Sequence, residues 1–212
     1  STDYELRAQG EDDYVEQVTL SFPLGATYNT VKAPLDPQAG NRVSLGVEPG
    51  ISFGDGEASY TRITSSASTY RKISDRLVAA VRAEAGTFLG DEGVPVDRKF
   101  FAGGGGSVRG FEYQSLSPTD SDGNIIGGDA MFAASLELRW RKSERWGYVA
   151  FVDSGYAADS IDEAFGEMRT SFGLGVRFYP GFGPVRFDIA TPLDRRDGED
   201  PVQIYVSIGQ SF

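Results

Sequence analysis

Apolar and polar residues alternate in the last twelve residues of the chain, PVQIYVSIGQSF. One face of this segment carries Val202, Ile204, Val206, Ile208 and Phe212. The other face carries Gln203, Tyr205, Ser207, Gly209 and Ser211. A period of two residues is typical of a β-strand with one apolar and one polar side. The segments VRFDIA and SFGLGVRFY repeat the pattern, so the end of the chain is predicted to consist of consecutive strands.

The same alternation along the whole chain predicts about ten strands. They span 2–9, 13–27, 41–49, 57–70, 75–89, 128–142, 145–157, 168–179, 184–193 and 202–212. The segment 57–70, rich in Ser and Thr, gives the weakest strand pattern, and DSIDEAFGE at 159–167 is the only candidate helix. YPGFGPV and RKSERW predict tight turns, the acidic LDRRDGEDP at 193–201 a solvated hairpin loop, and residues 90–127 one long connection.

Two architectures contain strands of this kind. A soluble sandwich buries its apolar faces, whereas a membrane barrel turns them to lipid and its polar faces to the lumen. The polar faces here carry charges of both signs, at Arg82, Glu84, Glu137, Arg139, Asp153, Arg177, Arg186 and Asp188. Aromatic residues stand near strand ends, where an interfacial girdle would lie: Trp140, Trp146, Tyr148, Tyr156 and Phe212. Both features favour an all-β, antiparallel transmembrane β-barrel, and the sandwich remains the alternative.

Composition narrows the chemistry. The chain has 212 residues, no cysteine, no histidine and a formal net charge of −11. Without histidine or cysteine, most zinc, haem and thiol chemistry and Ser-His nucleophiles are excluded, and the negative charge argues against a nucleic-acid partner. We therefore expect no catalytic residues, no metal site and no cofactor. The first residues, STDYELR, fit neither an initiator methionine nor a signal peptide, which predicts a processed chain or an excised piece.

Residues 100–114, FFAGGGGSVRGFEYQ, hold four consecutive glycines and one arginine between aromatic residues. A dinucleotide loop needs G-x-G-x-x-G before a helix, and a P-loop needs a lysine after its second glycine; Phe111 follows Gly110 here, and no helix pattern follows. A flexible linker would be polar throughout. The glycines instead predict a backbone that approaches another segment closely or adopts positive φ, and that delivers Arg109 to a set place.

Several motifs occur together and in order: FFAGGGGSVRGFEYQSLSP, IGGDAMFAASLELRW, VAFVDSG, GLGVRFYPGFGPVRFDIATPL and the terminal IYVSIGQSF. In combination they resemble the BamA/TamA superfamily of outer-membrane assembly and translocation barrels, the bacterial surface antigen family. The TamA branch fits best, through SVRGFEYQSLSP and GPVRFDIATPLDRR. The resemblance extends from about Asp13 to Phe212.

The resemblance implies that the long loop at 90–127 folds into the barrel lumen. The motif of this loop is Val108, Arg109, Gly110 and Phe111. Its arginine is expected to contact acids on two neighbouring inner strand faces, which correspond to Glu137 and Asp153. The alternation supports this independently, because both acids fall on polar strand faces. Two roles for Arg109 stay open: a staple of the fold, or a part of the mechanism.

Barrels of this family have sixteen strands and follow periplasmic POTRA domains. Residues 1–212, with about ten predicted strands and no POTRA-like sequence, are expected to be the C-terminal portion of such a barrel. The last strand of the family carries an assembly signal, which corresponds here to Tyr205, Gly209 and Phe212. Whether the chain is a fragment, part of a split protein or a small closed barrel stays open.

The resemblance also implies a function that is not enzymatic, in the bacterial cell outer membrane. The parent protein would help to insert or secrete proteins, including autotransporter-like clients. Its expected partners are outer-membrane lipid, client β-barrel or autotransporter proteins, the POTRA domains of the parent chain, and a periplasmic or inner-membrane protein of the TamB type. The alternative is a passive outer-membrane pore or channel.

Overall fold

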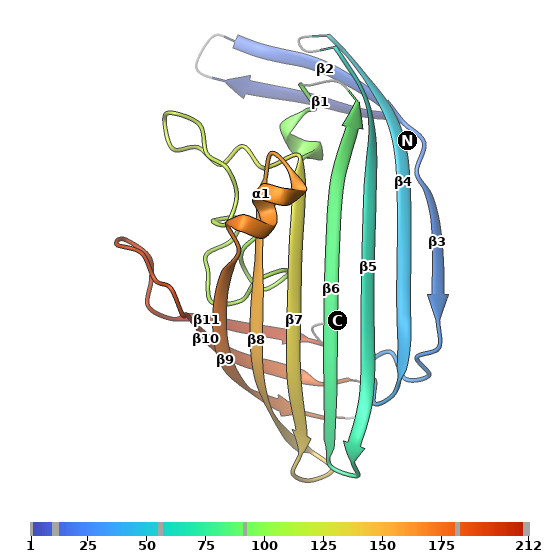
Figure 1. The fold of residues 1–212 in the computed structure, drawn as a ribbon, viewed down its shortest axis with the longest axis vertical. Helices are drawn as coiled ribbons and strands as arrows, with labels where there is room; N and C mark the ends of the chain where they lie inside the picture. Colours follow the sequence, from blue (N-terminus) through green and yellow to red (C-terminus); the bar gives the residue numbers. More distant parts are fainter. Residues whose placement is uncertain (1, 10–12, 55–56, 91–92, 181–182, 210–212) are drawn as a thin grey trace.

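The computed structural model describes residues 2–9, 13–54, 57–90, 93–180 and 183–209 (Figure 1). Eleven strands form one antiparallel sheet. They are β1 (Thr2–Gln9), β2 (Asp13–Ser21), β3 (Leu24–Asn29), β4 (Gly40–Gly54), β5 (Ala58–Ser74), β6 (Leu77–Gly90), β7 (Ala130–Arg141), β8 (Trp146–Ala158), β9 (Arg169–Phe178), β10 (Val185–Pro192) and β11 (Gln203–Ile208). Neighbours in sequence are neighbours in the sheet, except that β2 and β3 both pair with β4. The all-β antiparallel class is therefore confirmed, and a two-sheet sandwich does not describe these strands.

The strand bounds differ from the sequence predictions at several places; the strand predicted over 41–49, for example, extends to Gly54 in β4. The strand predicted over 13–27 is interrupted at Phe22 and Pro23, because proline has no amide hydrogen to give to the ladder. Its two halves, β2 and β3, pair with residues 50–54 and 42–47 of β4 and so act as one bent strand. The Ser- and Thr-rich segment 57–70 lies in β5, which at 17 residues is the longest described strand.

Two short helices interrupt the strands. The 3-10 helix η1 (Val96–Arg98) lies in the long loop, and the six-residue α1 (Ile161–Gly166) follows β8. Helix α1 lies inside the predicted segment 159–167 and begins after Ser160, whose hydroxyl accepts a hydrogen bond from the Glu163 amide at 3.3 Å. Within the described residues, neither helix has the length and apolar character needed to cross a membrane.

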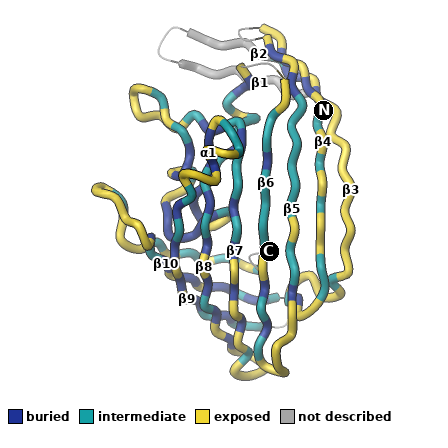
Figure 2. Tube along the Cα trace, viewed as in Figure 1, coloured by how far each residue is buried: buried dark blue, intermediate teal, exposed yellow. Residues whose placement is uncertain are grey.

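The two faces of the sheet differ sharply in character. Along β7 to β10 buried and more exposed residues alternate (Figure 2), and the buried set contains charged side chains, with Glu137, Asp153, Arg177 and Asp188 at most 1% exposed. The opposite face exposes large apolar side chains: Leu136, Leu138, Trp140, Trp146, Tyr148, Phe172, Leu174, Phe187 and Ile189. This arrangement is the reverse of that in a soluble protein and suits a polar interior with lipid outside.

The sheet curves around the long loop between β6 and β7 (Figure 1). The described part of this loop, 93–129, contacts every strand from β4 to β11, and one loop can reach eight consecutive strands only if the sheet bends around it. The contacting residues, one from each strand, are Glu48, Arg62, Arg82, Glu137, Asp153, Ser171, Asp188 and Tyr205. The loop thus occupies the concave side.

The facing of the strands gives a test by charge insertion. A charge on the outward face, in Phe187→Arg or Val206→Arg, should cost about 2–4 kcal/mol of folding free energy near the middle of a bilayer. The matched control is Ser207→Glu, whose position pairs with Arg186 on the inner face. Urea unfolding in lipid vesicles measures the difference, and a control variant that loses as much stability as Val206→Arg would reverse the assignment of the faces.

Candidate functional site

The glycines of the loop permit two close backbone approaches. Gly103 has φ of +105°, and a Cβ there would lie 2.6 Å from the Glu112 carbonyl oxygen. Gly110 has φ of +97°, and a Cβ there would lie 2.7 Å from the Ser171 Cβ on β9. Because larger residues rarely adopt positive φ, these two positions favour glycine on both grounds. They let the loop fold tightly on itself and press against the sheet.

An apolar cluster fixes the loop on the inner face. Five loop residues pack with Ala133 of β7 and Ala157 of β8: Phe100, Ala102, Val108, Phe111 and Leu116. The Ala157 amide also donates to the Leu116 carbonyl oxygen at 2.9 Å. Phe100 and Phe111 are 3% exposed, whereas Tyr113 is 77% exposed, so the aromatic residues around the motif do not all anchor it. Burial of these side chains places Arg109 next to the charged wall.

Arg109 is 2% exposed and is surrounded by carboxylates. Its Nε donates to Asp153 Oδ2 at 2.6 Å, and its Nη2 donates to Asp153 Oδ1 at 2.9 Å, a two-point contact of the kind that only a planar guanidinium fork makes. Its Nη1 lies 2.8 Å from Glu137 Oε1. The guanidinium carbon stands 3.4 Å from the centre of the Phe151 ring, which closes one side of the group. The structure thus brings together Arg109, Glu137 and Asp153, the three residues that the sequence pointed to.

A third acid belongs to the same cluster and was missed by the sequence analysis as an acceptor. Asp188 of β10 lies 3.2 Å from Arg109 Nη1 and 3.0 Å from Arg186 Nη2, and it also pairs with Arg177. Gly175 of β9 leaves room for this arrangement, because a Cβ there would collide with the Asp188 carboxylate. Asp188 was recognised as a residue of a polar strand face, but alternation alone does not tell how far across a curved sheet a loop arginine reaches.

The buried charges of this network compensate one another. We use "Arg109 network" for Arg109, Arg139, Arg177, Arg186, Glu137, Asp153 and Asp188. Arg139 joins it through Glu137, with Nε 2.7 Å from Oε2. Burial by itself lowers the pKa of Arg109, but the hydrogen bonds and charge of Asp153, with Glu137 and Asp188, outweigh burial and raise that pKa above its usual value. Arg109 is therefore cationic at any working pH.

A second arginine, Arg169, connects the segment 193–201, which we call the outer hairpin, with the loop that carries Arg109. Arg169, at the start of β9, donates from Nε to Asp194 at 2.5 Å and from Nη1 and Nη2 to Glu199 at 3.0 Å each. Its guanidinium carbon also lies 5.0 Å from the centre of the Phe111 ring. The segment 193–201, expected to be a solvated hairpin, is thus anchored at two of its acids. The acidic composition of this segment indicated that a cation could bind it. The sequence did not show which cation, because Arg169 lies about 25 residues away from Asp194.

Two residues of the expected C-terminal signal, Tyr205 and Gly209, lie in the described part of the chain. Tyr205 faces inward, and its hydroxyl contacts the backbone of Gly110 and Phe111. Gly209 has φ of +94°, and its amide donates to the Pro184 carbonyl oxygen at 2.8 Å. Phe212 lies outside the described residues. The assembly signal therefore stays a prediction.

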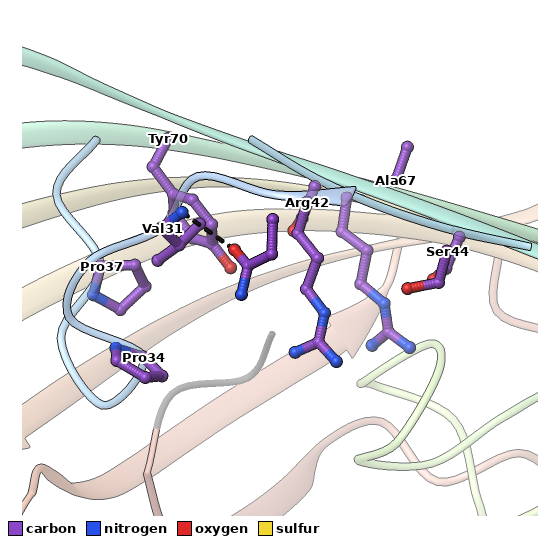
Figure 3. Close-up of a pocket in the computed structure, with 11 residues that line it drawn as sticks. Val31, Pro34, Pro37, Arg42, Ser44, Ala67 and Tyr70 are labelled. Carbon is purple, nitrogen blue, oxygen red and sulfur yellow. Dashed lines mark hydrogen bonds between the residues drawn. The ribbon is translucent and has the colours of Figure 1, made fainter. Parts of the chain in front are cut away.

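An open cavity of about 250 Å³ lies elsewhere on the inner wall (Figure 3). It is lined by residues of β3 to β6 and of the β3–β4 connection, among them Asn29, Arg42, Ser44, Tyr70 and Arg82. Figure 3 shows the Arg42 side chain extending from the sheet. None of its lining residues belongs to the Arg109 network, so the two features are separate.

Arg109 variants test the network. Arg109→Ala removes the cation that pairs with the buried Asp153, and breaking a fully buried pair costs about 3–5 kcal/mol. Arg109→Lys should recover only part of this, because an ammonium cannot hold two carboxylate oxygens as a fork does. The control is Arg42→Ala, which removes an exposed arginine of the same wall. Urea unfolding and protease sensitivity of residues 100–114 are the measurements; equal effects of Arg109→Ala and Arg42→Ala would contradict the network.

Arg169 gives a test with a defined pH dependence. Its hydrogen bonds lower the pKa of Glu199, so the stabilisation is present above the ordinary glutamate pKa of about 4.3 and is lost as the pH falls through the lowered value. Arg169→Gln should make segment 193–202 sensitive to protease already at neutral pH. Arg196→Gln, at a side chain 60% exposed, is the control. Protection of the segment in Arg169→Gln at pH 7 would exclude this anchoring role.

Comparison with known proteins agrees with this architecture. The model of the Omp85 superfamily domain matches residues 2–212. The outer membrane protein assembly factor BamA of Nitratidesulfovibrio vulgaris is 36% identical over 152 residues, which cover 68% of this chain and 19% of that protein. The crystal structure of BamA from Haemophilus ducreyi lacking POTRA domains 1–3 superposes with a TM-score of 0.76 at 21% identity, over 97% of this chain and 45% of that one.

These comparisons confirm the superfamily that the motifs indicated, whereas the TamA branch stays a prediction. The chain spans about a fifth of the length of its BamA relative and under half of the solved BamA chain. The solved structure, at this low identity, supports the fold alone. Because the family match runs from residue 2 to residue 212, the chain belongs to the Omp85 superfamily of bacterial outer-membrane proteins.

Proposed function

We propose that this chain supplies the membrane-spanning sheet of an outer-membrane protein assembly factor, which inserts client β-barrel proteins into the outer membrane. The observation that carries the proposal is the Arg109 loop, which contacts the inner face of eight consecutive strands and is fixed to β7, β8 and β10 by buried charges. A passive pore needs an unobstructed interior, whereas this loop is packed into the concave side of the sheet.

The work on clients is done by strand pairing and not by bond chemistry. A strand at the edge of a sheet has unpaired amide and carbonyl groups, which are a template for another strand. Strands β1 and β11 are the two ends of the described strand order. The loop holds the curvature of the wall while a client strand adds to an edge. This function needs no catalytic residue and no cofactor.

The partners follow from the same proposal. The apolar outer face contacts outer-membrane lipid, and the edge contacts client β-barrel proteins, of which autotransporters are the finer proposal. POTRA domains of the parent chain and a periplasmic or inner-membrane protein of the TamB type complete the set. The name of the BamA relative, an outer membrane protein assembly factor, supports the general role.

Reconstitution of the full-length parent protein in lipid vesicles tests the proposal. The wild type should accelerate the folding of an added client barrel. Arg109→Ala should reduce that rate by about tenfold or more, because breaking a buried pair costs about 3–5 kcal/mol and each ~1.4 kcal/mol changes the population of the seated loop about tenfold. Ionic conductance of the same vesicles is recorded in parallel. Steady conductance with no acceleration of client folding would overturn the proposal in favour of the passive pore.

A further inference from the structure

The strand β11 is held by few contacts within the described part of the chain. It is the last strand in the sheet order and pairs with β10 over six residues. Its apolar side chains Ile204, Val206 and Ile208 are 60–71% exposed on the outward face, so they pack little against the rest of the sheet. The inner-facing side chains must therefore supply any further attachment of this strand.

Tyr205 supplies that attachment through its hydroxyl. The Gly110 amide donates to the Tyr205 oxygen at 2.9 Å, and the Tyr205 hydroxyl donates to the Phe111 carbonyl oxygen at 3.0 Å. One hydroxyl thus uses its donor and an acceptor site on two neighbouring residues of the loop motif. Both contacts involve backbone groups of the loop. The positive φ of Gly110 orients its amide and the following carbonyl toward Tyr205.

The ring of Tyr205 reinforces the same connection. It packs on the cluster of Val149, Phe151 and Ala190. Phe151 in turn lies under the guanidinium of Arg109, at 3.4 Å from ring centre to Cζ. On the loop side, the Cβ position of Gly105 would lie 3.0 Å from the Tyr205 ring. The side chain of Tyr205 therefore connects its own strand, β11, with the loop that carries Arg109.

We propose that Tyr205 is a positioning residue that holds the edge strand β11 against the Arg109 loop, so that the seating of the loop sets how far β11 can move from the sheet. When the two hydrogen bonds are present, β11 and the loop move as one unit. When they are lost, β11 keeps its ladder with β10 among the described residues, and the edge of β11 that points away from β10 becomes more accessible to a client strand. The part that concerns clients rests on the proposed function.

The substitution Tyr205→Phe removes both hydrogen bonds and keeps the ring. The matched control is Tyr148→Phe, at a tyrosine that is 40% exposed on the outward face of β8. Tyr113→Cys and Ile208→Cys, at two exposed positions, carry the spin labels; residues 1–212 have no other cysteine, and any cysteine elsewhere in the parent protein is first replaced by serine. The full-length parent protein in vesicles is used throughout.

The first arm measures the distance between the two labels and needs no client. Tyr205→Phe should broaden the distance distribution and raise amide exchange in β11 and at Gly110 about fivefold or more, as expected for two lost hydrogen bonds, while Tyr148→Phe leaves both unchanged. Unchanged distances and exchange in Tyr205→Phe would overturn the proposal. So would equal loosening of the β7–β8 hairpin, because Tyr205 would then be a general staple of the fold.

The second arm measures capture of a client strand by a photocrosslinker at position 208. Tyr205→Phe should increase capture relative to wild type and to Tyr148→Phe, because β11 is released more often. Unchanged or reduced capture together with a broadened distance would overturn the link to clients. If the wild type does not accelerate client folding at all, the proposed function fails, whereas the distance arm still decides the connection between Tyr205 and the loop.

Discussion

A guanidinium buried among three carboxylates is the interaction on which the rest of the structure depends. Arg109 comes from a loop, and Glu137, Asp153 and Asp188 come from β7, β8 and β10. A buried charge costs several kcal/mol unless it is paired, so neither the arginine nor the acids can occupy these positions alone. The loop and the wall are therefore mutually dependent: Arg109 is seated by the acids of the wall, and Asp153 takes its ion pair from the loop. Glu137 and Asp188 are also paired with Arg139, Arg177 and Arg186 of the wall.

This dependence explains the unusual composition of the loop. A loop that must pass close to a curved sheet needs backbone without side chains at its points of contact, and Gly103 and Gly110 meet that need. Aromatic and apolar residues around the glycines bury the loop and exclude water from the arginine. The loop therefore combines three kinds of residue: glycines that allow close approach to the sheet, apolar residues that bury the loop, and one arginine that binds the acids.

The loop also joins the interior to two elements at the margin of the sheet, the hairpin between β10 and β11 and the strand β11. Arg169 connects the hairpin after β10 with Phe111, and Tyr205 connects β11 with Gly110 and Phe111. Both contacts converge on the residues directly after Arg109. The loop motif therefore connects the strand β11 and the hairpin before it with the buried charges around Arg109.

Resemblance to a known family identified the loop motif. The sequence by itself determined most of the strands and their facing, because alternation with a period of two is a local property of the chain. It also placed Glu137 and Asp153 on polar faces, where Arg109 reaches them. Local patterns do not contain distances between strands, and so the tertiary structure alone decided that Asp188 joins the cluster. The same holds for the outer hairpin, which is bound by Arg169, and for Tyr205, which faces the loop. Each of these contacts spans 25 to 95 residues of sequence, and the curvature of the sheet brings the partners together.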